Sequence, residues 1–358
     1  MGALLNGWNR FFFGTLPAWP LGLFRIAFGL VVVVDLLYLR FDGQMWFGPD
    51  GVLPYSDWMT VVKFPRVSLF PLLPESSWSV EAVLCLGVVA GCFLTMGLQS
   101  RACSVLVWLV LASLHHRNPF LFNSGDTLLR VLGFWLMFAE SGRAWSFDRL
   151  LRQARGVEPD GEPRVVAWPI RMMQLQVCWM YLSTGVWKAQ GPLWRSGLAV
   201  YYVLGLPELS NWPLPAFARS VEFSMAATWG TLLVEIGLPF ALWWRRYRYA
   251  AIGCGVAFHF GLEYCLNVAV FQWIAIASMI LFAETRSKAR EAVVRRSGGS
   301  PEPALTAGCD IAKNAGSYGL ATIHNRHYRT LHIGRFLRIA EGPWPSCGID
   351  STSLLSIR

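Results

Sequence analysis

Charged residues are scarce in this sequence. Asp, Glu, Lys and Arg make up only 15% of its 358 residues, whereas hydrophobic residues make up 54%. This balance is too apolar for an ordinary soluble domain of such length. A large soluble protein with buried helices is the alternative, but long runs with little charge are typical of helices that cross a bilayer. The shortage of charge therefore predicts an integral membrane protein.

Cofactor and disulfide motifs are also missing. The sequence contains no CxxC pair with zinc-site spacing and no disulfide framework. It has no recognisable nucleotide, haem or iron–sulfur motif. Most of the cysteines lie in or beside apolar stretches, where cysteine behaves as a small hydrophobe. Those cysteines are Cys85, Cys92, Cys103, Cys178, Cys254 and Cys265.

Several hydrophobic segments approach the length of about 20 residues that a helix needs to span a bilayer. The eight candidates cover 21–39, 79–98, 102–116, 127–140, 168–188, 221–244, 248–263 and 266–283. The third and fourth are short and the last two nearly abut, so the count ranges from seven to nine. We predict an all-α fold, a polytopic transmembrane bundle of about eight helices over residues 1–284.

The two ends of the chain carry further information. The first segment contains Arg25 and Asp35 and no small-residue cleavage site follows it, so we expect it to stay in the mature protein. Each of these two ionisable groups is expected to pair with another helix. Residues 285–358 are mostly polar and show no helical or strand period, which predicts a disordered cytoplasmic tail.

Lys and Arg gather in alternate connecting segments. The 141–171 segment and the segments after the sixth and eighth spans are rich in them, whereas segments of the opposite parity are poorer. Short cytoplasmic loops collect these residues. We therefore predict a multi-pass protein of the cell inner membrane with both termini cytoplasmic. The net charge of +9 is explained by the same rule and by basic residues that face anionic lipid. The lipid bilayer is therefore the expected partner, and nucleic acid is not.

Three motif-like segments fall on the opposite, non-cytoplasmic side. They are FGPDGVLP (47–54), RNPFLFNSGD (117–126) and GPLWRSG (191–197), which includes Trp194. Their shared side allows them to meet around one site. Gly, Pro and Asn are also the usual residues of tight turns at helix ends, so each segment has a purely structural interpretation as well.

Ionisable residues inside the spans are the next candidates, because a buried charge in a bilayer is costly unless paired or functional. Asp126 and Arg130 are four residues apart, which favours a local ion pair and a helix cap, or else a polar entrance to a cavity. His259 and Glu263 have the same spacing, which suits a hydrogen-bonded pair or a proton relay. A metal site would need further ligands, and we predict none.

Lys188 ends the pattern YLSTGVWK, in which Tyr181, Thr184 and Lys188 share one helix face. A lysine held at the membrane edge is partly desolvated, which disfavours the ammonium and favours an amine that can act as a general base. The alternative is a lysine that extends to the headgroups from a helix end. Glu235 has no local basic partner, so it must find one on another helix or be protonated.

These residues lie in segments that resemble a known family. LFRIAFGLVVVVDLLY, FGPDGVLP, SLHHRNPFLFNSGDTLLRVLGFWLMF, QLQVCWMYLSTGVWKAQGPLWRSGLAVYYVL and FHFGLEYCLN look like the HTTM family, whose membrane domain is shared with vitamin K-dependent gamma-carboxylase. The match runs in order over roughly 18–284. The resemblance implies a lysine that deprotonates vitamin K hydroquinone before oxygen is added, and Lys188 in TGVWKAQGPLW stands at that position.

The sequence also departs from that enzyme. Animal gamma-carboxylases carry a large β-rich domain after the membrane part, where this chain has a short polar tail, so peptide carboxylation is not expected. The resemblance implies a histidine in an Asn-rich segment before the fourth span, where this chain has Gly125 and Asp126.

Three classes of function follow from the sequence. The first is a membrane enzyme acting on a quinone, such as reduced vitamin K or menaquinone, or on another lipid-soluble substrate. Its catalytic residues would be Lys188 and His259, and its substrate-binding residues Asp126, Arg130, Tyr181, Trp194 and Glu263. The second is a transporter, against which no internal repeat is visible. The third is a non-catalytic module that holds a protein partner, which the sequence does not identify.

Overall fold

The computed structural model describes residues 2–62, 67–157 and 161–283, so the predicted tail 285–358 lies outside the described residues. The α-helices are α1 (Gly2–Phe13), α2 (Trp19–Phe41), α3 (Gly43–Phe47), α4 (Tyr55–Val61), α5 (Ser77–Met96), α6 (Ser100–Arg117), α7 (Ser124–Leu136), α8 (Phe147–Ala154), α9 (Trp168–Gln190), α10 (Pro192–Arg195), α11 (Ala199–Leu204), α12 (Val221–Trp243), α13 (Arg248–Cys265) and α14 (Phe271–Met279). Short 3₁₀ helices are η1 (Phe70–Leu72), η2 (Ser141–Arg143), η3 (Pro207–Leu209), η4 (Ala216–Arg219) and η5 (Ile280–Phe282). The prediction of an all-α fold is confirmed.

Each predicted hydrophobic segment overlaps one helix, and the helices differ in their capacity to cross a membrane. Among the described residues, α2, α5 and α12 are long and apolar enough to do so. Helix α7 ends at Leu136 rather than at residue 140, and α14 begins at Phe271 rather than at 266. Residues before α14 form a turn in which Ala269 has a φ of 44°, which breaks the helix. With 13 residues, α7 is about 20 Å long, shorter than the hydrocarbon core.

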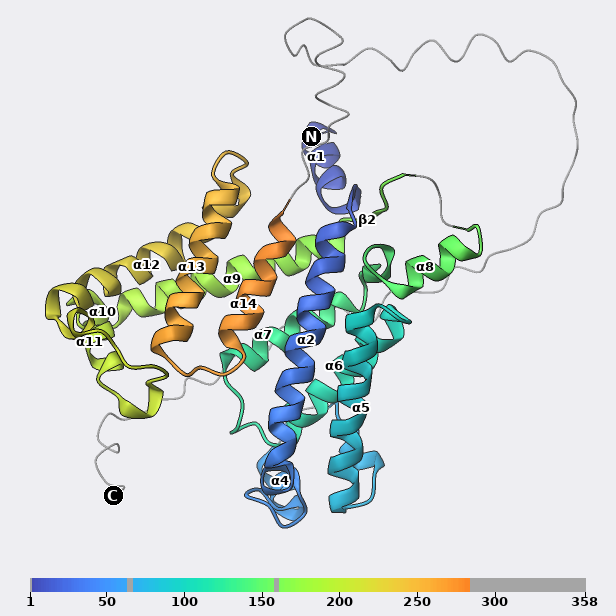
Figure 1. The fold of residues 1–358 in the computed structure, drawn as a ribbon, viewed down its shortest axis with the longest axis horizontal. Coiled ribbons are helices and arrows are strands. Elements are labelled where there is room, and N and C mark those ends of the chain that lie inside the picture. Colours follow the sequence, from blue (N-terminus) through green and yellow to red (C-terminus); the bar gives the residue numbers. More distant parts are fainter. Residues whose placement is uncertain (1, 63–66, 158–160, 284–358) are drawn as a thin grey trace, which may run out of the picture. The chain divides into compact units, whose positions relative to one another are not determined.

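The apolar core is built around α2, which lies beside α5 (Figure 1). Phe24, Phe28, Val32 and Leu36 recur at helical spacing along α2 and are fully buried. Helix α5 also packs against α6, and α7 packs against α6 and α9. This contiguous packing carries the core from α2 to the helix that bears Lys188.

Helices α9 and α12 run antiparallel. They are in close contact because Gly185 of α9 lies against α12. A Cβ atom at Gly185 would lie 2.8 Å from Ile236 Cγ1 and 3.2 Å from Glu235 Cβ. Further along the pair, the Cys178 thiol lies near the backbone of Pro239, which breaks the hydrogen-bond ladder of α12. The absence of a side chain at position 185 therefore sets the spacing where Lys188 and Glu235 face each other.

A small antiparallel sheet joins the start of α2 to the start of α9. Strand β1 (Thr15–Pro17) pairs with β2 (Arg164–Val166), with Leu16 opposite Val165. The Ala18 amide donates to the carbonyl of Pro163 at 2.9 Å. Both helices then begin with a Pro in the first turn, where the missing N–H is not needed.

Candidate functional site

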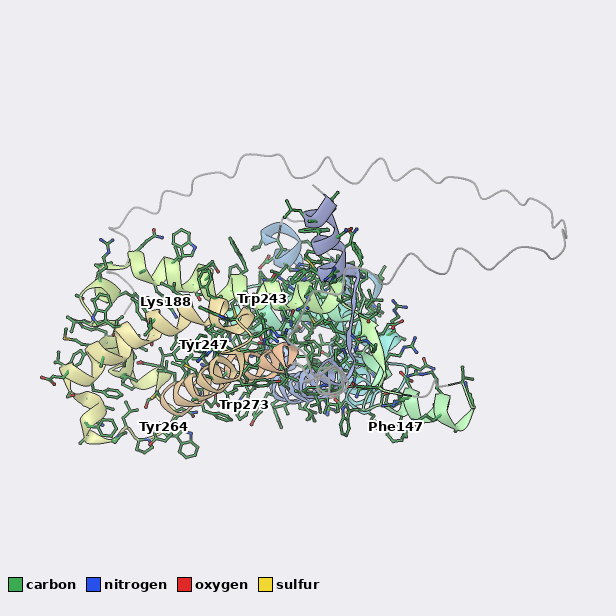
Figure 2. The ribbon with its side chains drawn as sticks, turned by 90° about the horizontal axis from the view of Figure 1, so that it is seen from above. Phe147, Lys188, Trp243, Tyr247, Tyr264 and Trp273 are labelled. Carbon is green, nitrogen blue, oxygen red and sulfur yellow. The ribbon has the colours of Figure 1, made fainter. Side chains whose placement is uncertain are left out.

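Lys188, near the C-terminal end of α9, is paired with a buried carboxylate. Its Nζ atom donates to Glu235 Oε1 of α12 in an ion pair. The Glu235 side chain is 8% exposed and that of Lys188 is 33% exposed. Glu235 Oε2 is buried and has no hydrogen-bond partner among the described residues. The sequence required Glu235 to find a partner on another helix or to be protonated, and the structure supplies the partner as Lys188, labelled in Figure 2.

Trp194 covers the same ammonium group. The Lys188 Nζ atom lies 5.2 Å from the centroid of the Trp194 ring, a cation–π contact. The local sequence explains the placement, because Gly191 ends α9 in an extended conformation and Pro192 begins α10. The chain therefore turns back over Lys188, and the predicted substrate-binding residue Trp194 lies beside the predicted base.

Tyr181 and His259 form a second buried group two turns from Lys188. The Tyr181 hydroxyl donates to His259 Nε2, and His259 Nδ1 donates to Gln272 Oε1 of α14 at 2.5 Å. All three side chains are buried. With the Tyr181 hydroxyl as donor and His259 Nε2 as acceptor, each hydrogen has an acceptor. If His259 Nε2 donated instead, the Tyr181 hydroxyl hydrogen would have no acceptor among the described residues. Gln272 thereby fixes the tautomer and orientation of the imidazole.

The two groups share one face of α9. Tyr181 and Lys188 are seven residues apart, so they lie about 10 Å apart along the same side of the helix. Glu235 from α12 and His259 from α13 contact Lys188 and Tyr181 on this face, and Gln272 from α14 joins the group through His259. The structure thus brings together Lys188, Tyr181, His259 and Trp194 of the predicted site, and adds Glu235 and Gln272.

Glu263 is not joined to His259 in this arrangement. His259 is hydrogen-bonded across helices to Tyr181 and Gln272, while the Glu263 carbonyl accepts from Asn211 Nδ2 at 2.8 Å. Residues four apart share a helix face, but inter-helix packing decides which neighbour each side chain reaches. Glu263 therefore contributes to the end of α13, where Tyr264 also donates to the Pro213 carbonyl.

Asp126 completes a helix cap. Asn123 Oδ1 accepts from the Gly125 amide at 2.6 Å, and Asp126 Oδ2 accepts from the Asn123 amide at 2.7 Å, a capping box at the start of α7. No ion pair between Asp126 and Arg130 is found among the described residues. Arg130 instead lines a cavity of about 280 Å³ whose wall includes His116.

The start of α7 nevertheless lies one layer from the buried histidine. A Cβ atom at Gly125 would lie 2.7 Å from Phe271 Cα at the start of α14. The Phe271 ring contacts His259 with centroids 5.7 Å apart, and Gln272 is the next residue along α14. Only glycine permits this close approach of α7 to α14. The resemblance implies a histidine in this segment, and in this chain the segment supplies a packing contact at Gly125 instead.

Two of the three motif-like segments meet. Arg117 donates to the carbonyl of Leu53 at 2.8 Å and to that of Gly48 at 2.9 Å, and Asn118 Nδ2 donates to the Trp46 carbonyl at 3.0 Å. These bonds hold 47–54 against 117–126. The third segment, 191–197, forms α10 and its flanks beside Lys188. The turn interpretation accounts for the first two segments, because the side chains of Arg117 and Asn118 donate to backbone carbonyls there.

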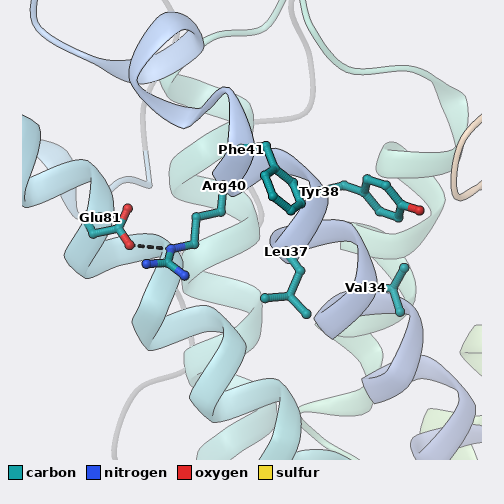
Figure 3. Close-up of a pocket in the computed structure, with 6 residues that line it drawn as sticks. All are labelled: Val34, Leu37, Tyr38, Arg40, Phe41 and Glu81. Atoms are coloured by element: carbon teal, nitrogen blue, oxygen red, sulfur yellow. Dashed lines mark hydrogen bonds and ion pairs between the residues drawn. The ribbon is translucent and has the colours of Figure 1, made fainter.

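The larger described cavities lie away from Lys188. A cavity of about 900 Å³ is lined by Val34, Leu37, Tyr38 and Phe41 of α2, with an ion pair between Arg40 and Glu81 at its side (Figure 3). Another, of about 530 Å³, lies between the C-terminal half of α11 and the N-terminal end of α12. Neither includes the predicted site residues, so the site is defined by its buried polar side chains and not by cavity volume.

Sequence reasoning missed Gln272 altogether. A glutamine in the apolar segment FQWIAIASM is the signal that could have found it, because polar groups inside a span persist where they have a partner. Among the described residues, no group of three or more His, Cys, Asp or Glu side chains is placed to hold a metal ion. The groups that the site offers are the lysine of Lys188, the carboxyl group of Glu235, the phenol of Tyr181 and the imidazole of His259.

Comparison with known proteins gives the family. No solved structure matches the chain. The family model described as the HTTM domain matches residues 14–286, which is more than half of the chain and includes every site residue named above. The protein thus belongs to the HTTM domain family.

Proposed function

We propose that this HTTM protein is a multi-pass membrane enzyme that performs acid–base chemistry on a lipid-soluble hydroxylated substrate, with reduced vitamin K or menaquinone as the candidate. The observation that carries the proposal is the Lys188–Glu235 ion pair, a lysine and a carboxylate held together on two helices. A structural pair alone does not require one partner to be one-third exposed while the other keeps a buried oxygen that has no hydrogen-bond partner in the described part of the chain.

The pair can accept a proton from a substrate hydroxyl. Once Lys188 has lost its own proton, its amine takes the proton of the substrate and becomes an ammonium again, and the Glu235 carboxylate stabilises that ammonium through their hydrogen bond. The substrate is left as an oxyanion, and the low local dielectric strengthens its attraction to the new ammonium. Trp194 limits water on the exposed side of Lys188.

A hydroquinone fits these groups chemically. It is flat and apolar and has two hydroxyl groups. Glu235 Oε2, which has no partner within residues 2–62, 67–157 and 161–283, is an acceptor for one of them. Access from the bilayer is consistent with the exposed ring of Trp187, the residue before Lys188 on α9. Tyr181 and His259 would hold or return a proton two turns away, with Gln272 keeping the imidazole in one orientation.

The membrane arrangement is part of the proposal. We infer that α2, α5, α6, α7, α9, α12, α13 and α14 form the transmembrane bundle, with both termini on the cytoplasmic side of the inner membrane. The support is the alternation of Lys and Arg between connecting segments, which makes the 141–171 segment cytoplasmic. The C-terminal end of α9, with Lys188, would then face the periplasm or lumen.

Oxygen consumption tests the enzymatic proposal, because a deprotonated hydroquinone is readily oxidised by O₂. The detergent-purified protein is supplied with reduced menaquinone or vitamin K. Activity is expected in the wild type, none in K188A/E235Q, and unchanged activity in R195A, whose exposed guanidinium contacts the Gln190 carbonyl. The double variant is used because it leaves no unpaired buried carboxylate.

Activity that survives in K188A/E235Q would exclude Lys188 as the base. Absence of both consumption and hydroquinone binding in the wild type would exclude the enzymatic proposal and favour the alternative, a non-catalytic transport or scaffolding protein. Vesicle uptake assays and co-purification of a partner would then separate those two functions.

A further inference from the structure

The cavity of about 280 Å³ that includes Arg130 is separate from the Lys188 site. Residues of α6, α7 and α9 line it, and its α9 residue is Gln176, which lies 12 residues before Lys188. This separation is about 18 Å along the helix axis and about 120° around it. The side chains of Gln176 and Lys188 therefore leave α9 in different directions.

Arg130 brings to this cavity a positive charge that no group in the wall balances. None of the described residues that line the cavity is Asp or Glu. In the described part of the chain, the Arg130 guanidinium has no ion-pair or hydrogen-bond partner. Asp126, one turn earlier on α7, does not line the cavity and accepts from the Asn123 amide. Because a guanidinium keeps its proton, the cavity is positively charged.

Two further polar side chains belong to the wall. Gln176 is partly buried, and its amide has no hydrogen-bond partner among the residues that the structure describes. His116 Nδ1 donates to the Val67 carbonyl at 3.0 Å, which leaves Nε2 as the other polar atom of the ring. Arg130 and Gln176 thus supply N–H donors from two helices. A ligand that satisfies both must present acceptor atoms.

The rest of the wall is apolar. Trp108 of α6 and Phe134 of α7 have ring centroids 5.6 Å apart, and those of Phe134 and Trp135 are 5.1 Å apart. A free hydrated anion would lose water against these rings without compensation, whereas an apolar chain gains from the contact. The aliphatic members of the wall are Val67, Ala112 and Val131.

We propose that this cavity binds the carboxylate end of a long-chain fatty acid. Arg130 donates to the two carboxylate oxygens with paired N–H groups, and Gln176 donates a further hydrogen bond. One guanidinium balances one negative charge. The first part of the chain lies against the rings of Trp108, Phe134 and Trp135, and the remainder continues into the bilayer.

The size of the cavity favours a single-chain carboxylate. Sites that enclose drug-sized ligands measure about 300–1,000 Å³, and this cavity is smaller. A carboxylate group needs little room, whereas a phospholipid headgroup brings a glycerol backbone and two chains. The inference does not use Lys188 or Glu235, so it is independent of the proposed enzymatic function.

The test measures binding of radiolabelled oleate to the full chain purified in detergent, by scintillation proximity and without a hydroquinone. Saturable binding is expected, and unlabelled oleate should displace the label. Oleyl alcohol, which has the same chain and no charge, should not displace it, nor should acetate, which has the carboxylate without the chain. No turnover is measured, so failure of this test leaves the Lys188 proposal unaffected.

R130Q should lower the affinity for oleate by about ten- to hundredfold, because it removes the charged donor. Its thermal unfolding midpoint without ligand should stay near that of the wild type, since no protein partner of Arg130 is lost in the described part of the chain. R219Q is the matched control and should bind oleate as the wild type does. Arg219 is exposed, likewise lacks a partner among the described residues and does not line this cavity.

Absence of saturable binding, or unchanged affinity in R130Q, would overturn the proposal. Displacement by oleyl alcohol as effective as that by oleate would exclude a site that recognises the carboxylate. Displacement by phosphatidylglycerol at lower concentration than by oleate would assign the cavity to a phospholipid instead. If R130Q does not fold, Q176L serves and should weaken binding at least about threefold. Unchanged affinity in Q176L would then count against the proposal.

Discussion

Replacement of Lys188 by Ala should lower stability because it leaves a charge buried on the neighbouring helix. Glu235 is 8% exposed and its ion pair with Lys188 is the contact that compensates its carboxylate. Its other oxygen already lacks a partner among the described residues. K188A therefore removes the compensation and leaves the desolvation cost.

The size of the effect follows from the burial of the two groups. Breaking a fully buried pair costs about 3–5 kcal/mol. Lys188 is 33% exposed, so solvent screens part of the interaction, and we expect about 2 kcal/mol. K188A/E235Q replaces the unpaired carboxylate by a neutral amide and should recover most of that loss. The single variant should melt about 4 °C below the wild type, because 1 kcal/mol shifts Tm by roughly 2 °C in a large domain.

Thermal unfolding in detergent, followed by tryptophan fluorescence, measures all four members of the cycle: wild type, K188A, E235Q and K188A/E235Q. Non-additivity of the two single effects is the expected signature of direct coupling. A K188A protein as stable as the wild type, or a double variant no more stable than K188A, would refute the argument that Glu235 depends on Lys188. The same cycle separates loss of stability from loss of activity.

Two further substitutions test how the fold positions the site. G185V should lower the free energy of unfolding by about 1–3 kcal/mol, because its Cβ would lie 2.8 Å from Ile236 Cγ1 and force α9 from α12. G237A, on α12 with open space at its Cβ, is the matched control, and equal midpoints for the two variants would contradict the prediction. R117L should cost about 3 kcal/mol and speed amide exchange in 47–54, since it removes two charge-assisted hydrogen bonds to that segment. Unchanged exchange there would show that Arg117 does not hold the segment.

Local sequence features determined much of this protein. The length of each hydrophobic run predicted each major helix. In lipid the backbone must satisfy its own hydrogen bonds, so a segment that spans the bilayer is a helix built mostly of apolar residues. Lys188 stood out because a lysine held at the membrane edge is partly desolvated, which disfavours its charged form. The capping box at Asn123 and Asp126 was likewise readable, since it depends on residues three apart in sequence. The boundaries of α7 and α14 were less certain, because fraying and turns depend on contacts outside the segment.

The identity of the partners was decided only by tertiary structure. Lys188 meets Glu235 across 47 residues, and His259 meets Tyr181 across 78 residues and Gln272 in the next helix in place of Glu263. Helical periodicity states which residues share a face, but not which face of another helix lies opposite. That choice is made by close packing, as at Gly185, where the absence of a side chain lets α9 and α12 approach and brings the ammonium to the carboxylate.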